Sequence, residues 1–355
     1  MVGSALGHGW WLVGVAEAVP LPAAPAGVQV STEYGIEFST IGALGNPAYT
    51  GAVGSVYESY PRGSLNYEYR IGRTEVPTGL WMEFSNTFIN RTSVGPTFAV
   101  PTTWGATPDP DRPFYWKLDD RVTDAYWVPV TGINWRQAAM FCNWLHNDKA
   151  TDLAAIASGA YDISTFGNGN AMGGGGFTDQ LVHSPGAKYW IPSLDEWVKA
   201  VYFDPDRYGP AQPGYWIYPT RSNDVPLGGF PGEGQTNAGF LGGGYERLIP
   251  LGSYPDVQTA WGLLDASGSA AEWTETIFPD RDRFSGLPTS RFALGSQLSI
   301  GPADYPPDPL DQIDQPSTFD PRTHIPGLRL AAAVPGPSVI VPLIGVVCVA
   351  VRRRR

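Results

Sequence analysis

The stretch Ile133-Asn-Trp-Arg-Gln-Ala-Ala-Met-Phe-Cys-Asn-Trp-Leu145 carries the strongest structural signal in this chain. Asn134 can cap a helix, and Gln137 stands three residues later, which is the spacing of a capping box. The apolar residues of the stretch then share one helical face: Trp135, Ala138, Ala139, Cys142 and Leu145. The stretch therefore predicts a helix packed against a hydrophobic core.

Two further segments also combine a helix start with apolar residues at helical spacing. Thr78 precedes an apolar stripe at helical spacing, made of Leu80, Trp81, Phe84 and Phe88. Ser193-Leu-Asp-Glu196 has the pattern of a second capping box, ahead of Trp197, Ala200 and Val201. The rest of the chain contains strand-sized fragments and turns. Residues 158–187 and 203–248 are rich in Gly and Pro and predict long loops.

The composition indicates one packed, loop-rich body. The 355 residues are 43% hydrophobic and 13% aromatic, and they include 13 Trp, 43 Gly and 34 Pro. The net charge is −11, and because Arg352 to Arg355 contribute +4, the rest of the chain carries −15. An acidic body repels phosphate backbones, so we expect no nucleic-acid partner.

Few residues suggest metal or redox chemistry. The chain has two cysteines, Cys142 and Cys348, without the C-x-x-C spacing of zinc or redox sites. Cys142 lies on the apolar face of a predicted helix, where a thiol is inert. The histidines have no H-x-x-x-H pairing and are interpreted as surface or loop residues: His8, His146, His183 and His324.

Both ends of the chain suggest export. Trp10 to Val15, followed by Ala16-Glu-Ala18, is similar to the end of a signal peptide with a small-x-small cleavage site. At the other end, a 13-residue apolar run, Val339–Val351, precedes Arg352 to Arg355. As a helix it would reach about 20 Å, which is short of a bilayer core of about 30 Å. The arginines should stay on the cytoplasmic side, which leaves the body outside.

Five segments together resemble the formylglycine-generating-enzyme family, also called the sulfatase-modifying-factor family. They occur in the family's order, and each is similar to one of its motifs: Asn66–Val76, Pro129–Leu145, Tyr189–Trp197, Trp261–Trp273 and Pro326–Leu330. The resemblance implies a single α+β domain related to the C-type-lectin-like fold, poor in regular secondary structure. It divides the chain into residues 1–27 (signal-peptide remnant and linker), 28–333 (family domain) and 334–355 (tail).

The tail resembles a PEP-CTERM sorting signal. Such signals carry Val-Pro-Glu-Pro, then an apolar run and arginines, and they are thought to be cut by a membrane protease, an exosortase. Here the lead is Val334-Pro-Gly-Pro337, with Gly336 in place of Glu. The expected partners are therefore the membrane, through the tail, and a sorting protease, and the expected location is the cell envelope or cell surface.

Although the motifs are similar, we expect this chain to lack the family's metal chemistry. Its oxidases use two late cysteines that bind copper, and here the corresponding stretch from Gly295 to Ile325 contains none. Iron-dependent relatives use histidines from a separate helical domain, which this chain lacks. We therefore predict no catalytic residue, no cofactor-binding residue and no copper.

Calcium is the metal that the resemblance implies. Family relatives bind it near the turn that corresponds to residues 265–272, and a second family position corresponds to Asn237. The ligands implied here are the side chains of Asp265, Glu272 and Asn237 and the carbonyls of Gly268 and Ala270. Ser269 and Ala271 replace family residues in this turn. The alternative is that Asp265 and Glu272 cap the turn and pair locally.

The aromatic residues divide into two groups. Those in family-like segments are expected to pack in the core: Trp135, Trp144, Trp197, Trp261 and Trp273. Those in a variable loop, Tyr215, Trp216 and Tyr218, are candidates for a ligand surface.

Three functions follow from these readings. The first is a non-catalytic, lectin-like binding or structural module of the cell envelope, with an extracellular polysaccharide or protein as ligand. The second is a formylglycine-generating-type or other metal-dependent oxidoreductase of the family. The third is a matrix protein whose acidic, glycine-rich surface contacts exopolysaccharide.

Overall fold

The structure is a computed structural model that describes residues 20–51, 60–92, 98–169, 175–238, 248–296 and 311–336. The predicted signal-peptide end at Trp10–Ala18 and the apolar run Val339–Val351 lie outside these residues. Within the described ranges, no helix has the length and apolar character needed to span a bilayer.

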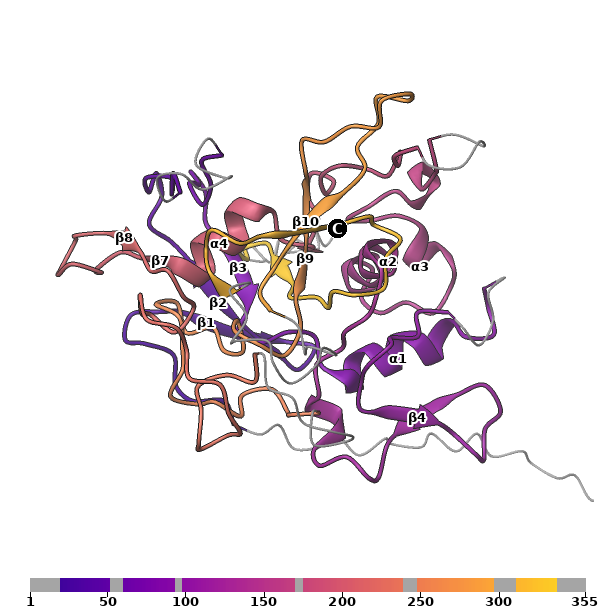
Figure 1. The fold of residues 1–355 in the computed structure, drawn as a ribbon. Helices are drawn as coiled ribbons and strands as arrows, with labels where there is room; N and C mark the ends of the chain where they lie inside the picture. Colours follow the sequence, from indigo (N-terminus) through magenta and orange to yellow (C-terminus); the bar gives the residue numbers. More distant parts are fainter. Residues whose placement is uncertain are drawn as a thin grey trace, which may run out of the picture.

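The three predicted helices are present. Thr78–Phe88 forms α1, Trp135–His146 forms α2 and Leu194–Tyr202 forms α4, and a short helix, α3, covers Ala154–Ala157. The capping boxes of α2 and α4 are complete: each cap side chain accepts a hydrogen bond from the backbone N–H three residues on, and the side chain there accepts one in return. Figure 1 shows α1, α2 and α3 on one side of the molecule, with α4 apart from them.

The largest sheet joins strands from both ends of the domain. Its order is β1-β2-β3-β12-β6, and every pair is antiparallel. The strands are Val30–Glu33 (β1), Ile36–Ile41 (β2), Tyr69–Gly72 (β3), Ala331–Ala332 (β12) and Tyr189–Trp190 (β6). Because β12 pairs with both β3 and β6, the end of the domain returns to its beginning, which places residues 30 and 332 in one sheet.

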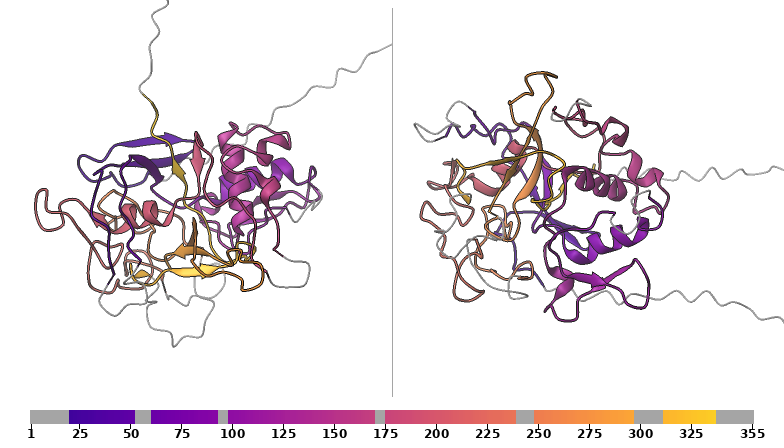
Figure 2. Two further views of the ribbon diagram at one scale, coloured as in Figure 1. Left: turned by 90° about the horizontal axis from the view of Figure 1, so that it is seen from above. Right: turned by 45° about the vertical axis from the view of Figure 1, so that its right-hand side comes forward.

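Smaller sheets complete the fold. A three-stranded sheet has the order β11-β10-β9. Its strands are Glu272–Ile277 (β9), Arg291–Leu294 (β10) and Ser317–Phe319 (β11). Two hairpins pair Ala106–Pro108 (β4) with Trp116–Leu118 (β5), and Phe203–Asp204 (β7) with Gly214–Tyr215 (β8). The views in Figures 1 and 2 show that loops connect most elements, as the high Gly and Pro content predicts.

One large hydrophobic cluster, with a small satellite at Val122, Ala125 and Val128, lies within the described residues. Its centre is aromatic: the rings of Trp81 on α1 and Phe141 on α2 stack with centroids 4.9 Å apart. The five tryptophans assigned to the core are all buried there. Tyr215 and Tyr218 are also buried, so their assignment to a ligand surface was wrong, and only Trp216 of that group is partly exposed.

Candidate functional site

The turn predicted to hold calcium is tightly folded. Asp265, Gly268 and Ser269 have positive φ angles of 54°, 85° and 56°, which fold the backbone tightly. A Cβ on Gly268 would lie 2.1 Å from Oδ1 of Asn237, so only glycine fits there. The same Oδ1 accepts a hydrogen bond from the Ser269 N–H at 2.6 Å. Asn237 therefore contacts the turn, and its side-chain oxygen bonds to the backbone.

Glu272, at the start of β9, is held by Arg329. The Arg329 Nε donates to both carboxylate oxygens at 3.0 Å, and Nη2 donates to Oε1 at 2.8 Å. The other guanidinium hydrogen bonds go to the carbonyls of Gly72 and Leu264, and the Trp197 indole donates to Glu272 as well. Both side chains are buried, so this is a fully desolvated, multiply hydrogen-bonded ion pair.

Two other buried carboxyl groups lie beside this pair. Oε1 of Glu75 accepts from the Ala270 N–H at 3.1 Å, and Oε2 has no hydrogen-bond partner in the described part of the chain. Burial, reinforced by the negative charge of Glu272, raises the pKa of Glu75 well above its usual value. Burial also raises the pKa of Asp265 to about 6, although its Oδ2 accepts from the Gly252 N–H at 2.7 Å.

These contacts bear on the calcium prediction. Calcium requires six to eight oxygen ligands. Here Arg329 already supplies the positive charge for Glu272, and the side-chain oxygen of Asn237 faces an N–H donor. In the ranges that the structure describes, no three His, Cys, Asp or Glu side chains converge on one point. The described geometry does not fit a calcium ion at Glu272, and calcium at Asp265, Gly268, Ala270, Glu272 and Asn237 stays a prediction.

The region that corresponds to the family's copper site is closed by hydrogen bonds at its described edges. Asp311 accepts from the Ser296 N–H at 2.7 Å and from the hydroxyl of Ser267. Residues 297–310 between these edges lie outside the described residues. The thiol of Cys142 is fully buried on α2, and burial raises its pKa well above the usual value. Its predicted position in the core is confirmed.

An open hollow lies beside Trp216. Its volume is about 600 Å³, and three segments line it: Pro22, Ala23 and Pro25; Trp216, Thr220 and Arg221; and Pro255, Asp256 and Gln258. The first segment is anchored by a hydrogen bond of 2.6 Å from Arg73 to the Pro22 carbonyl. It also packs against Gly262, where a Cβ would lie 2.9 Å from Pro25. We call this feature the Trp216 hollow.

The hairpin of β7 and β8 positions the aromatic wall of the Trp216 hollow. Asp204, buried at the end of β7, accepts from the Trp216 indole at 3.0 Å and from Arg221 at 3.1 Å. The guanidinium of Arg207 lies 4.6 Å from the centroid of the Trp216 ring. Arg207 is not among the residues that line the hollow, whereas Trp216 is. The ring is therefore fixed at its edge and on one face.

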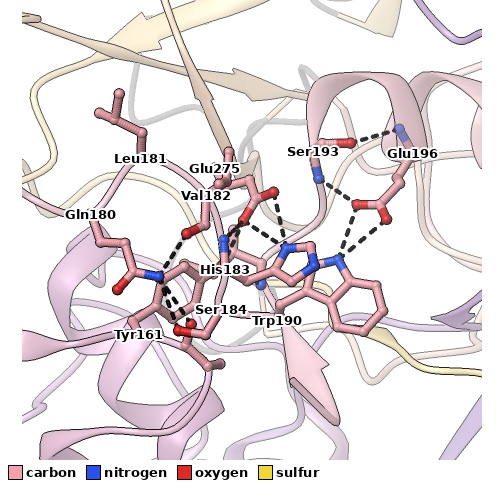
Figure 3. A network of polar contacts seen from close by, with 12 residues as sticks. Tyr161, Gln180, Leu181, Val182, His183, Ser184, Trp190, Ser193, Glu196 and Glu275 are labelled. Carbon is pink, nitrogen blue, oxygen red and sulfur yellow. Dashed lines mark hydrogen bonds and ion pairs between the residues drawn. The ribbon is translucent and has the colours of Figure 1, made fainter. Parts of the chain in front are cut away.

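A third polar cluster surrounds Glu275 on β9 (Figure 3). Its buried carboxylate accepts from the Tyr161 hydroxyl at 3.0 Å, from the His183 N–H at 2.8 Å and from His183 Nδ1 at 3.1 Å. The His183 ring stacks on Trp190 at 4.4 Å. Burial disfavours the charged ring, but the hydrogen bond and charge of Glu275 outweigh this and raise the pKa of His183. His183 and Glu275 are 92 residues apart, and no local sequence pattern links them.

Comparison with known proteins identifies relatives of the whole scaffold. Residues 55–312 match a family described as the sulfatase-modifying factor enzyme 1-like domain. No curated protein matches the chain. Among solved structures, Treponema denticola variable protein 1 aligns with 20% identity and a TM-score of 0.50, covering 86% of this chain and 99% of its own. Another, titled "Crystal Structure of CarF", has 16% identity and a TM-score of 0.46, covering 84% and 99%. The predicted α+β, C-type-lectin-like fold is confirmed.

Proposed function

This chain belongs to the sulfatase-modifying factor enzyme 1-like family, and we propose that it is an exported, non-catalytic binding protein of the cell envelope. The family match covers the scaffold from residue 55 to residue 312. In this proposal the protein binds a polysaccharide or another protein outside the cell and does not convert a substrate.

The observation that carries the proposal is the state of Cys142. It is the only cysteine inside the matched residues, and its thiol is fully buried with a raised pKa. Copper binding and oxygen activation at cysteine require an accessible thiolate. A buried, protonated thiol among apolar side chains supports a packing role for Cys142 instead.

An oxidase assay tests this proposal against the alternative of a metal-dependent oxidoreductase. The purified full chain would be loaded with copper or iron, its metal content measured, and oxygen uptake followed with a cysteine-containing peptide. We expect no stoichiometric metal and no turnover above the metal-only background, and the same result for Cys142→Ala. Stoichiometric copper or iron together with peptide oxidation would replace the binding function with an enzymatic one.

The exported location rests on the two ends of the chain. The apolar run and the terminal arginines Arg352 to Arg355 support membrane engagement, with the body outside. We propose that a sorting protease of the exosortase type processes the tail at or near Val334-Pro-Gly-Pro337. Protease added to intact cells should digest the body, and mass spectrometry of the released protein should lack the arginines. A body protected from external protease would contradict export.

The calcium that the family resemblance implies at this turn is a separate prediction, and the contacts of its implied ligands argue against it. Arg329 and the Ser269 N–H already satisfy the oxygens of Glu272 and Asn237. We therefore expect a calcium titration by calorimetry to give no heat at this turn and no rise in melting temperature. Stoichiometric heat that disappears in Asp265→Asn would establish the calcium site.

A further inference from the structure

We propose that the Trp216 hollow binds a neutral polysaccharide chain, whose sugar rings stack on the ring of Trp216. The inference rests on the proposed binding function and names the ligand class and the site. The hollow has the volume of an ordinary small-ligand site, about 600 Å³, and enough room for a few sugar units.

The aromatic platform is fixed before any ligand arrives. Asp204 holds the Trp216 indole at its edge, and Arg207 covers one face of the ring. Trp216 is partly exposed and lines the hollow. The C–H face of a sugar ring is apolar and can pack flat on such a surface. Because the ring is already ordered, binding would cost little side-chain entropy.

Polar groups around the ring suit a ligand rich in hydroxyls. Arg221 is held by Asp204 and is still 46% exposed. Asp256 adds a carboxylate to the lining, whereas the amide of Gln258 already bonds to Ala23 and Arg73. A sugar hydroxyl both donates and accepts hydrogen bonds, so it can bond to the guanidinium of Arg221 and to the carboxylate of Asp256.

Charge argues for a neutral chain. The guanidinium groups of Arg221 and Arg207 beside Trp216 are offset by the carboxylates of Asp204 and Asp256, which leaves no net positive charge there. The chain apart from its four terminal arginines carries −15. An acidic body of this kind repels an anionic polysaccharide.

The walls also disfavour a peptide. An extended peptide is usually held by backbone hydrogen bonds, which need N–H donors along the site. Three of the nine lining residues are Pro22, Pro25 and Pro255, which have no N–H. Their rings instead add apolar surface beside Trp216. A sugar chain can use this surface, since its contacts depend on stacking and on side-chain hydrogen bonds.

Calorimetry on the full chain tests the inference. The probes are four neutral hexasaccharides (cellohexaose, xylohexaose, mannohexaose and laminarihexaose), with polygalacturonate and a proline-rich peptide as the competing classes. We expect at least one neutral probe to bind. Trp216→Ala should weaken that binding by about tenfold or more, which is the loss typical of a central aromatic contact. Trp216→Phe should retain part of the affinity, and Arg221→Ala should weaken binding less.

Phe284→Ala is the matched control, because Phe284 is a highly exposed aromatic outside the hollow and should not affect binding. Melting temperatures of all variants check folding. The inference is overturned if no neutral probe binds, if Trp216→Ala and Arg221→Ala bind as the wild type does, or if only the polyanion or the peptide binds. The oxidase assay does not depend on these outcomes, so it tests the non-catalytic proposal independently.

Discussion

The turn at Asp265–Glu272 and the Trp216 hollow both combine charged and aromatic side chains, but they differ in how deeply these side chains are buried and in how completely they are hydrogen-bonded. At the turn, Glu272 and Arg329 are fully buried, and an indole and backbone carbonyls complete their hydrogen bonds. At the hollow, Arg221 is half exposed, and Trp216 is partly exposed. The turn is closed by protein donors, whereas the hollow leaves groups available to a ligand.

This difference separates residues that hold the scaffold together from residues that could meet a ligand. Glu75, Trp197, Glu272 and Arg329 come from four separate family-like segments and meet at one buried cluster. Their hydrogen bonds join the sheets and α4, so they serve the fold. The Trp216 hollow is made from residues 22–25, which precede those segments, and from loops between them, where the sequence can vary without loss of the core.

The largest expected effect comes from Arg329→Met, which breaks the buried ion pair. The Glu272 carboxylate would lose its positive partner in a dry environment, at a cost of about 3–5 kcal/mol in the free energy of unfolding. Urea denaturation measures this. The control is Lys188→Met, which removes an exposed pair with Asp148 and should cost less than about 1 kcal/mol. Equal costs for the two variants would show that burial is not what distinguishes the turn.

The free energy of unfolding should depend on pH through the ionisation of Asp265. Because burial raises its pKa to about 6 in the folded protein, the neutral form stabilises the fold. That contribution is complete below the unfolded pKa, near 4, and is lost as pH rises through about 6. The loss amounts to about 3 kcal/mol. Asp265→Asn should not show it, so its stability relative to wild type should rise between pH 4 and pH 7. Parallel profiles for the two proteins would contradict the prediction.

At the hollow, Asp204→Asn should have a smaller effect. The amide keeps the shape but removes the charge that holds Trp216 and Arg221, and part of that interaction is exposed to solvent. We expect a loss of about 1–2 kcal/mol in the free energy of unfolding. Asp256→Asn, on the opposite wall, should leave stability unchanged. If both variants were neutral, Asp204 would not be what fixes the Trp216 ring.

The smallest effect concerns the cluster in Figure 3. Since the pKa of His183 is raised in the fold, its charged form stabilises below about pH 6.5, and this is lost as pH rises further. His183→Gln should remove that dependence. Burial and the charge of Lys188 lower the pKa of His146, so His146→Gln should change the profile in the opposite direction. Denaturation at pH 5.5 and pH 8 compares them. The same sign for both would contradict the contacts with Glu275.

Local patterns predicted part of this structure well. The capping boxes at Asn134 and Ser193 and the apolar faces of α2 and α4 require only neighbouring residues, and both helices form as expected. The burial of the core tryptophans followed from the same family-like segments. Strands such as β6 and β12 contain two residues each, too few for any periodicity, so sequence could not locate them.

The candidate site was predicted less well, for a physical reason. Trp216 is partly exposed and stays a candidate for a ligand surface, but Tyr215 and Tyr218 beside it are buried. Whether a loop aromatic faces solvent depends on what packs over it, and here the hairpin pairs Tyr215 with Phe203. The wall opposite Trp216 comes from residues 22–25 and 255–258, which no local pattern links to it.

The sequence by itself determined the helices, the acidic body, the apolar tail with its arginines and the absence of late cysteines, because these are properties of adjacent residues or of composition. The tertiary structure decided which charges meet. Glu272 pairs with Arg329, which is 57 residues away in the sequence, and Glu275 pairs with His183, which is 92 residues away. Such pairs depend on strands that return to sheets begun far away in the chain, and only the folded chain brings them within hydrogen-bond distance.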